Sequence, residues 1–244
     1  MNTIKSIGIV GHGRFGKLLE SLLKKIRPSI DLKMYSRNIS PDSKRFFSVN
    51  DTVQCDLIIV AISIRAFEKV VKRIAKKFKE DSIVMDVCSV KVYPVNVMEK
   101  YLPQSITIIG SHPLFGPQTV KKFNDKLSGL KLAMTFVRGE RNKYEKVKKI
   151  FENLNLKIIE MSAKDHDKFA AKSQFPAHII GSIAAGIRLS SQPTDTKSNE
   201  VLNSFLEMIQ VDPTLLHDMY RYNSNCKKEL QKIKNSFESV IKML

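Results

Sequence analysis

The feature that most constrains the fold is a glycine-rich stretch near the N-terminus, residues 7–23, which reads IGIVGHGRFGKLLESLL. Three of its glycines, Gly11, Gly13 and Gly16, fit the pattern G-x-G-x-x-G. The β-branched residues before them are typical of a buried strand, and the leucines after them recur at helical spacing. The stretch therefore predicts a strand, a tight turn and an amphipathic helix in direct succession.

Such a turn needs residues without a Cβ atom, and it places free backbone N–H groups at the positive end of a helix. Gly11 would allow the bend, Gly13 the close approach of a pyrophosphate, and Gly16 the packing of helix against strand. The stretch predicts a dinucleotide site bordered by three more loop residues, His12, Arg14 and Phe15. The alternative is a tight turn between strand and helix that binds nothing.

The end of the second predicted strand, 32–35, bears on which dinucleotide would bind. An NAD site usually has an acidic residue there, which accepts hydrogen bonds from the ribose 2′-hydroxyl. This chain instead has Ser36 and Arg37, whose hydroxyl and guanidinium suit a 2′-phosphate. We therefore predict NADP as the cofactor, the alternative being that Arg37 is an ordinary loop arginine.

Apolar runs that read as strands alternate with helical patterns up to about residue 161, which predicts an α/β fold with a Rossmann-type, doubly wound parallel sheet. The remaining residues have helical patterns only. We expect a dinucleotide-binding domain over 1–161 and a smaller, all-helical domain over 162–244.

Ligands of such sheets collect at the carboxyl ends of the strands. Three polar clusters lie at those positions: one at Ser63, one in DVCSVK at 86–91, and one in GSHPLFGP at 110–117. His112, in the third, would lie between a strand that ends at Ile109 and a loop stiffened by prolines. It is suited to proton transfer at neutral pH, but a structural histidine fits the residues equally well.

The chain has 244 residues and a formal charge of +17. Residues 1–161 contain 30 Lys and Arg against 15 Asp and Glu, whereas residues 162–244 contain 11 against 9. Much of the excess lies on the predicted helix 64–79, IRAFEKVVKRIAKKFK. This helix is either a solvated surface or part of a field that attracts an anionic cofactor and substrate. We do not expect nucleic-acid binding, because no basic stretch is interleaved with aromatic residues and no binding motif is present.

No apolar run is long enough to span a bilayer, and the N-terminus lacks the pattern of a signal peptide, so we expect a cytoplasmic protein without membrane contact. Cys55, Cys88 and Cys226 are widely spaced and odd in number. We expect reduced thiols, with neither a disulfide framework nor a zinc site.

DVCSVK and GSHPLFGP together resemble the paired signatures of prephenate and arogenate dehydrogenases, enzymes of tyrosine biosynthesis. The segment 165–178, DHDKFAAKSQFPAH, resembles H-D-x-x-A-A-x-S-Q-F-x-x-H of the plant-type arogenate dehydrogenases. Thr196-Lys197, followed by Glu200, is similar to their T-K-x-x-E stretch. These matches follow the order of the family over most of the chain.

The resemblance implies NADP-dependent oxidative decarboxylation of arogenate to tyrosine, without a metal, by a homodimer that associates through its helical domain. In that case His112 polarises or deprotonates the ring hydroxyl, Ser89 bonds that hydroxyl or His112, and Lys91 lies nearby. Ser89 could instead be only the N-cap of the following helix. The remaining residues that we assign to the substrate site are Ser111, Gln174, His178 and Lys197.

The chain departs from the family at Glu207, where many prephenate-specific members have an arginine for the side-chain carboxylate. Lys197 or Arg221 could replace that arginine. From the length we also expect neither a fused chorismate mutase nor a separate regulatory domain. Prephenate dehydrogenase, or another NADP-linked reductase with a Rossmann and a helical domain, remains the alternative.

Overall fold

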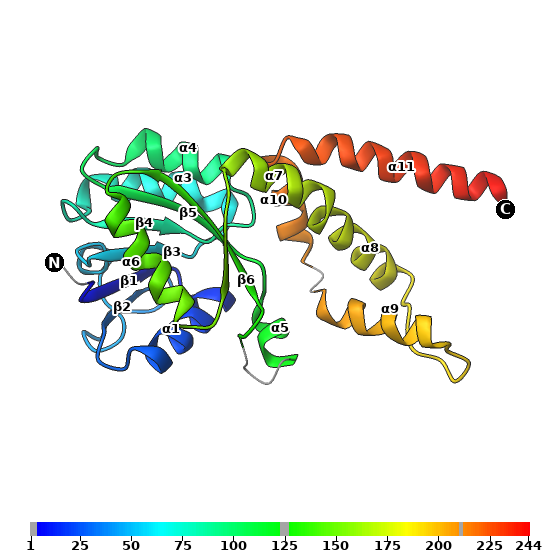
Figure 1. The fold of residues 1–244 in the computed structure, drawn as a ribbon, viewed down its shortest axis with the longest axis horizontal. Coiled ribbons are helices and arrows are strands. Elements are labelled where there is room, and N and C mark those ends of the chain that lie inside the picture. The colour runs from blue at the N-terminus through cyan, green and yellow to red at the C-terminus, as the bar shows by residue number, and fades with distance from the viewer. Residues whose placement is uncertain (1–3, 123–126, 210–211) are drawn as a thin grey trace. The chain divides into compact units, whose positions relative to one another are not determined.

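The computed structural model describes residues 4–122, 127–209 and 212–244, and it divides into two compact units, Met1–Lys164 and Asp165–Leu244 (Figure 1). The first unit contains a seven-stranded sheet with helices on its faces. The second unit is helical.

The sheet has the strand order β2-β1-β3-β4-β5-β6-β7. Its strands are β1 (Ser6–Val10), β2 (Asp31–Tyr35), β3 (Leu57–Val60), β4 (Ile83–Asp86), β5 (Thr107–Pro113), β6 (Lys131–Arg138) and β7 (Lys157–Glu160). The chain runs from β1 to β2 on one side and then returns to place β3 on the other side of β1. The order reverses at this point, which is where sheets of this type bind dinucleotides. The predicted Rossmann-type α/β fold is confirmed.

One pair of strands departs from a purely parallel sheet. β5 and β6 are antiparallel, with a register shift between Ile108 and Ile109, and the pairing continues through His112, which lies opposite Ala133. The prediction that the strand ends at Ile109 is therefore wrong. The last residues of β5 extend beyond the last β4 residue paired with them, Met85, so His112 lies on regular strand at the carboxyl edge of the sheet.

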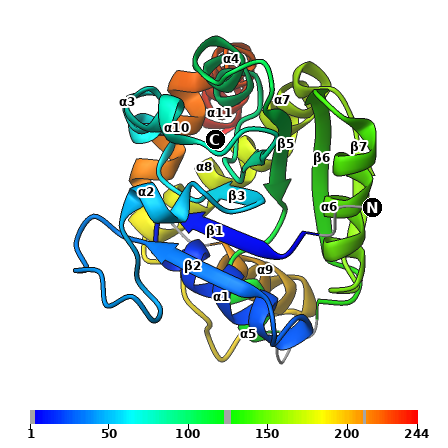
Figure 2. The same ribbon diagram turned by 90° about the vertical axis from the view of Figure 1, so that its left-hand side faces the viewer.

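Helices α1 (Arg14–Ile26) and α6 (Arg141–Glu152) bury their apolar faces in one core together with side chains of the strands. Helices α3 (Ile64–Ile74) and α4 (Val92–Tyr101) pack against each other and lie across the sheet from α1 (Figure 2). Shorter helical segments complete the unit: α2 (Val49–Thr52), the 3₁₀ turn η1 (Ala75–Lys77) and α5 (Pro117–Lys122).

The second unit consists of the greater part of α7 (Ala163–Lys172) with α8 (Gln174–Gly186), α9 (Lys197–Met208), α10 (Pro213–Tyr222) and α11 (Asn225–Met243). Its small core contains Ala171, Phe175, Met219 and Cys226. α7 and α8 are separated at Ser173, so Pro176 lies in the first turn of α8, where no intrahelical N–H is required. α10 begins with an Asp212 side chain that accepts from the Leu215 N–H and with Pro213 at its first position.

In the ranges that the structure describes, no helix has both the length and the apolar character needed to cross a membrane.

Candidate active site

A cleft of about 450 Å³ lies at the carboxyl edge of the sheet, where the strand order reverses. Four segments line it: the glycine turn after β1, the end of β2, the end of β3 and one face of α3. The lining residues are Val10, Gly11, Gly13, Tyr35, Ser36, Arg37, Asn38, Ala61, Ile62, Ser63, Ala66, Lys69, Val70 and Arg73.

The glycine turn leaves room for a ligand at one particular position. Gly11 has φ +112°, and a Cβ there would lie 2.2 Å from the Ala61 carbonyl oxygen, so the fold itself requires glycine. A Cβ on Gly16 would lie 2.2 Å from the Gly11 oxygen. A Cβ on Gly13 would meet nothing within 4 Å. Packing therefore explains Gly11 and Gly16, whereas the open space at Gly13 fits the close approach of a diphosphate.

The residues predicted around this cofactor site do not all lie in the cleft. Ser36, Arg37 and Ser63 line it, and Ser63 is also the residue that precedes α3. Arg14 is the first residue of α1 and is not among the residues that line the cleft. The Phe15 ring instead lies 6.2 Å from the Phe115 ring, between centroids.

His12 belongs to an ionic cluster that joins the glycine turn to the loop after β2. Its Nε2 lies 2.9 Å from Oε2 of Glu20, a buried residue of α1. Arg45, from the loop, donates from Nε and Nη2 to the two carboxylate oxygens of Glu20, both at 2.8 Å. Burial alone raises the pKa of Glu20, but hydrogen bonds from Arg45, Lys24 and His12 outweigh it and lower the pKa to about 2. The cluster therefore fixes two walls of the cleft relative to each other.

The two motifs that suggested catalysis are held together by one buried carboxylate, Asp86, the last residue of β4. It accepts hydrogen bonds from the backbone N–H groups of Cys88, at 2.8 Å, and of Ser111, at 3.1 Å. The Lys91 ammonium donates both to Asp86 and to the Ser111 carbonyl, and the Ser111 hydroxyl donates to the Asp86 carbonyl. The side chain of Lys91 is 1% exposed and that of Asp86 is fully buried. We call these hydrogen-bonded residues, Asp86, Lys91 and Ser111, the buried junction. It fixes the position of Ser111, the β5 residue that directly precedes His112.

His112 is 7% exposed and lies beyond the junction on β5. Ser89 is half-buried. The alternative that Ser89 caps the next helix is wrong, because α4 begins at Val92 and the residue at its N-cap is Lys91. Ser111, predicted as a substrate contact, is fully buried and directs its hydroxyl to the Asp86 carbonyl.

In the helical unit, Gln174 and His178 both lie on α8, one turn apart. Burial lowers the pKa of His178 below its ordinary value, although the Asp212 carboxylate partly opposes this effect. The His178 side chain is therefore neutral at neutral pH.

Lys197 is the first residue of α9, and its ammonium lies 2.5 Å from a Glu200 carboxylate oxygen. Thr196 and Asn199 form a capping box at the same helix start. The T-K-x-x-E stretch thus has a local structural role in beginning α9.

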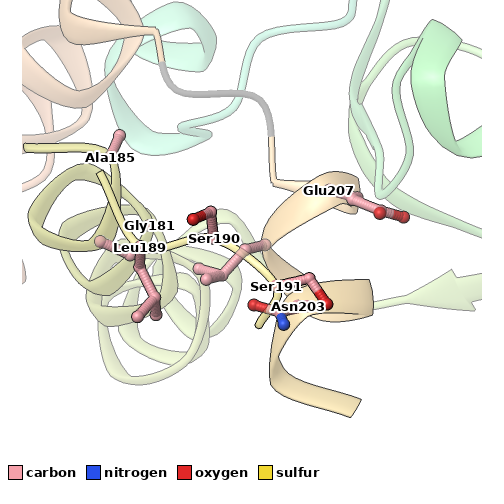
Figure 3. Close-up of a pocket in the computed structure, with 9 residues that line it drawn as sticks. Gly181, Ala185, Leu189, Ser190, Ser191, Asn203 and Glu207 are labelled. Atoms are coloured by element: carbon pink, nitrogen blue, oxygen red, sulfur yellow. The ribbon is translucent and has the colours of Figure 1, made fainter. Parts of the chain in front are cut away.

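A second cavity, of about 330 Å³, lies between α8, the loop that follows it and α9 (Figure 3). Glu207 lines it together with Asn203 and Ser190. Gln174, His178 and Lys197 do not line it.

Three residues that the structure places in the junction or in the cleft are not identified in the sequence analysis. Asp86 has a visible signal, since it begins DVCSVK, but its role depends on contact with Ser111. Lys69 and Arg73 line the cleft from α3, whereas in the sequence analysis the lysine-rich helix is treated as a whole, either as a solvated surface or as part of an attracting field. Their signal is the i, i+4 spacing, which places both on one helix face.

Cys55, Cys88 and Cys226 are all buried free thiols. Across the ranges 4–122, 127–209 and 212–244, no group of three or more His, Cys, Asp or Glu side chains is arranged to hold a metal ion.

Comparison with known proteins gives consistent results. The family model "Prephenate dehydrogenase, nucleotide-binding domain" matches residues 42–160. Arogenate dehydrogenase 2, chloroplastic, of Arabidopsis thaliana is 33% identical over 98% of this chain and 69% of that protein. Arogenate dehydrogenase 1, chloroplastic, of the same plant is 32% identical over 98% of this chain and 39% of that protein.

Among solved structures, prephenate dehydrogenase from A. aeolicus in complex with hydroxyphenyl propionate and NAD⁺ superimposes with a TM-score of 0.75. Its sequence is 20% identical, and the match covers 99% of this chain and 91% of that one. The likeness extends over both units. The Arabidopsis relatives are chloroplastic by name, so the cytoplasmic location of this chain stays a prediction.

Proposed function

This chain belongs to the prephenate dehydrogenase family of oxidoreductases, and on that premise we propose that it is an NADP-dependent arogenate dehydrogenase. The observation that carries the choice of substrate is that two relatives named arogenate dehydrogenases match 98% of the chain. The choice of NADP is supported by the end of β2, where Ser36 and Arg37 line the cleft and no carboxylate does among the described residues.

The residues of the cleft fit a nicotinamide dinucleotide. Gly11, Gly13 and Gly16 form the turn for the diphosphate, and Ser36 with Arg37 binds the ribose end. When bound, the cofactor supplies the hydride acceptor for a reaction in which the substrate ring loses carbon dioxide and becomes aromatic. No metal enters this mechanism.

His112 accepts the proton of the ring hydroxyl as the hydroxyl carbon is oxidised, and Ser89 contributes a hydroxyl that orients either the substrate or the imidazole. Lys91 serves as a positioning residue, because its ammonium is occupied by Asp86 and the Ser111 carbonyl. Lys91 and Asp86 together fix the backbone of Ser111, and they thereby set the orientation of the neighbouring His112. Pre-positioning of this kind lowers the barrier, since the base need not be reorganised during the reaction.

Gln174, His178 and Lys197 are the side chains that we propose for the substrate in the helical unit. A neutral His178 can both donate and accept a hydrogen bond, which suits the polar side chain of the substrate.

We further propose a homodimer formed through the helical unit. Two of its helices expose apolar side chains: Ile180 and Ile183 on α8, with Ile187 directly after its last residue, and Phe237, Val240 and Ile241 on α11. Exposed apolar faces of this kind usually mark an interface. Light scattering of the purified protein should give the mass of two chains, and a monomer that turns over substrate at full rate would contradict the proposal.

The activity is tested by supplying purified protein with arogenate or prephenate, each with NADP or NAD, and following the absorbance of the reduced nicotinamide. We expect the highest kcat/KM with arogenate and NADP. A higher kcat/KM with prephenate would overturn the substrate, and an equal or higher value with NAD would overturn the cofactor.

A further inference from the structure

One face of α3 forms a wall of the cofactor cleft. Ala66, Lys69, Val70 and Arg73 all line the cleft, and their spacing of three and four residues places them on a single helical stripe. Ser36 and Arg37 line the same cleft from the end of β2. Two elements far apart in the sequence therefore each contribute cations to one cavity.

The charge in this cleft is entirely of one sign. Its lining contains Arg37, Lys69 and Arg73, and no Asp or Glu among the residues that the structure describes. In the same described ranges, neither Lys69 nor Arg73 forms an ion pair with a carboxylate. Three cations in one cavity repel one another, and a bound anion relieves this repulsion.

The apolar members of the stripe suggest which anion fits. Ala66 and Val70 add apolar side chains to the same stripe, which suits an adenine ring, and the cations suit a phosphate attached close to that ring. The glycine turn is the proposed site of the diphosphate, so the cations of α3 remain for a second phosphate group. The lining therefore favours an adenosine that carries its own phosphate on the ribose.

We propose that Lys69 and Arg73 of α3 bind the 2′-phosphate of the adenosine ribose together with Arg37, and that they are specificity-determining residues for NADP. This inference rests on the proposed choice of NADP and extends it to a second structural element. It divides the lysine-rich helix into a binding face and a solvated face.

The same helix offers a matched control. Lys72 carries the same charge, adjoins Arg73 in the sequence and does not line the cleft. Its ammonium lies 5.8 Å from the centroid of the Tyr101 ring on α4, on a different side of the helix. Removing the Lys72 charge changes the general field by a similar amount without touching the cleft.

The test measures the dissociation constants of 2′,5′-ADP and 5′-AMP by calorimetry, with no turnover involved. The variants are Lys69→Met, Arg73→Met, Arg37→Ala and the control Lys72→Met. For each of the first three, we expect the affinity for 2′,5′-ADP to fall by about tenfold or more, as for the loss of a charge-assisted hydrogen bond. The affinity for 5′-AMP should change by no more than about twofold. Lys72→Met should leave both affinities near the wild-type values.

The outcomes separate the two proposals. If wild-type protein binds 2′,5′-ADP no better than 5′-AMP, the proposal of NADP fails. If wild-type protein and Arg37→Ala behave as expected but Lys69→Met and Arg73→Met retain wild-type affinity, the assignment to α3 alone fails. It also fails if Lys72→Met weakens 2′,5′-ADP as much as Arg73→Met does, because the effect would then be a general one of surface charge. Circular dichroism of each variant verifies that the helix is intact.

Discussion

Replacing Lys91 by methionine tests whether the buried junction, rather than a direct contact of Lys91 with substrate, explains the presence of this lysine. Methionine fills much of the same volume without a charge. In the Lys91→Met variant, Asp86 retains only the backbone N–H groups of Cys88 and Ser111 among the donors described above. The Ser111 carbonyl also loses the ammonium. The variant thus leaves a fully buried carboxylate without its cation.

The magnitude follows from that burial. Removing one partner of a buried ion pair costs about 3 to 5 kcal/mol of unfolding free energy, far more than the same change at the surface. For a chain of this size, we expect a fall in Tm of roughly 6 to 20 °C.

Differential scanning calorimetry of wild type, Lys91→Met, Asp86→Asn and the double variant provides the measurement. The double variant should lose less stability than the sum of the single variants, since neither charge then remains buried alone. It should not return to wild type, because Cys88 and Ser111 donate to different oxygens of Asp86, and asparagine has an NH2 group in place of one of them. The turnover of the folded fraction of Lys91→Met should fall as well, with the dissociation constant of NADP nearly unchanged. Wild-type Tm combined with lost turnover in Lys91→Met would refute the reasoning and make Lys91 a catalytic residue.

Two further predictions concern His112 and Glu20. His112→Asn should lower kcat by about a hundredfold to ten-thousandfold, as expected for the loss of a positioned base. NADP affinity and Tm, measured on the same variant, should stay near wild type. Near-wild-type turnover would contradict the catalytic role. For Glu20, the folded-state pKa of about 2 lies below the ordinary 4.5, so its contribution to stability is present above pH 4.5 and is lost as the pH falls toward 2. Wild-type unfolding free energy should therefore decrease over that range by on the order of 3 kcal/mol more than that of Glu20→Gln, and parallel pH profiles from chemical denaturation would exclude this role of the carboxylate.

The parts of the fold that local chemistry determines could be predicted from sequence. The turn at Gly11 requires a positive φ next to the Ala61 carbonyl, and only glycine tolerates both conditions. Asp212 followed by Pro213 begins α10 because the first turn of a helix needs an acceptor side chain and can do without one N–H. In both cases the residues that determine the local structure lie within a few positions of it in the sequence.

The end of β5 could not be read in the same way. Residues 110–113 contain glycine, serine, histidine and proline, which are typical of a loop. They form strand because β6, some twenty residues later, supplies antiparallel partners such as Met134 for Ser111 and Ala133 for His112. Pairing with a strand at that separation outweighs local propensity, and no local sequence pattern indicates it.

The environments of individual lysines could not be predicted from the sequence either. Lys69, Lys72 and Lys91 are indistinguishable as residue types, and helical periodicity separates only the apolar stripe from the rest. In the fold, Lys69 faces the cofactor cleft, Lys72 lies over an aromatic ring, and Lys91 is almost completely buried. Lysine is rarely buried without a partner, so the position of Lys91 is decided by Asp86, five residues earlier, and by the strand that brings Ser111 beside it.

The junction also gives a physical reason for the two motifs to occur together. Asp86 is the first residue of DVCSVK, and it bonds the N–H of Ser111 in GSHPLFGP, while Lys91, the last residue of DVCSVK, bonds the carbonyl of the same serine. Both backbone polar groups of Ser111 are thus satisfied by the other motif, in a fully buried setting where an unmade hydrogen bond is costly. A change at either end of DVCSVK therefore disturbs the residue adjoining His112, even though neither end reaches the imidazole itself through the bonds described. The orientation of His112 therefore depends on both motifs. Asp86 and Lys91 can position the proposed base without touching the substrate.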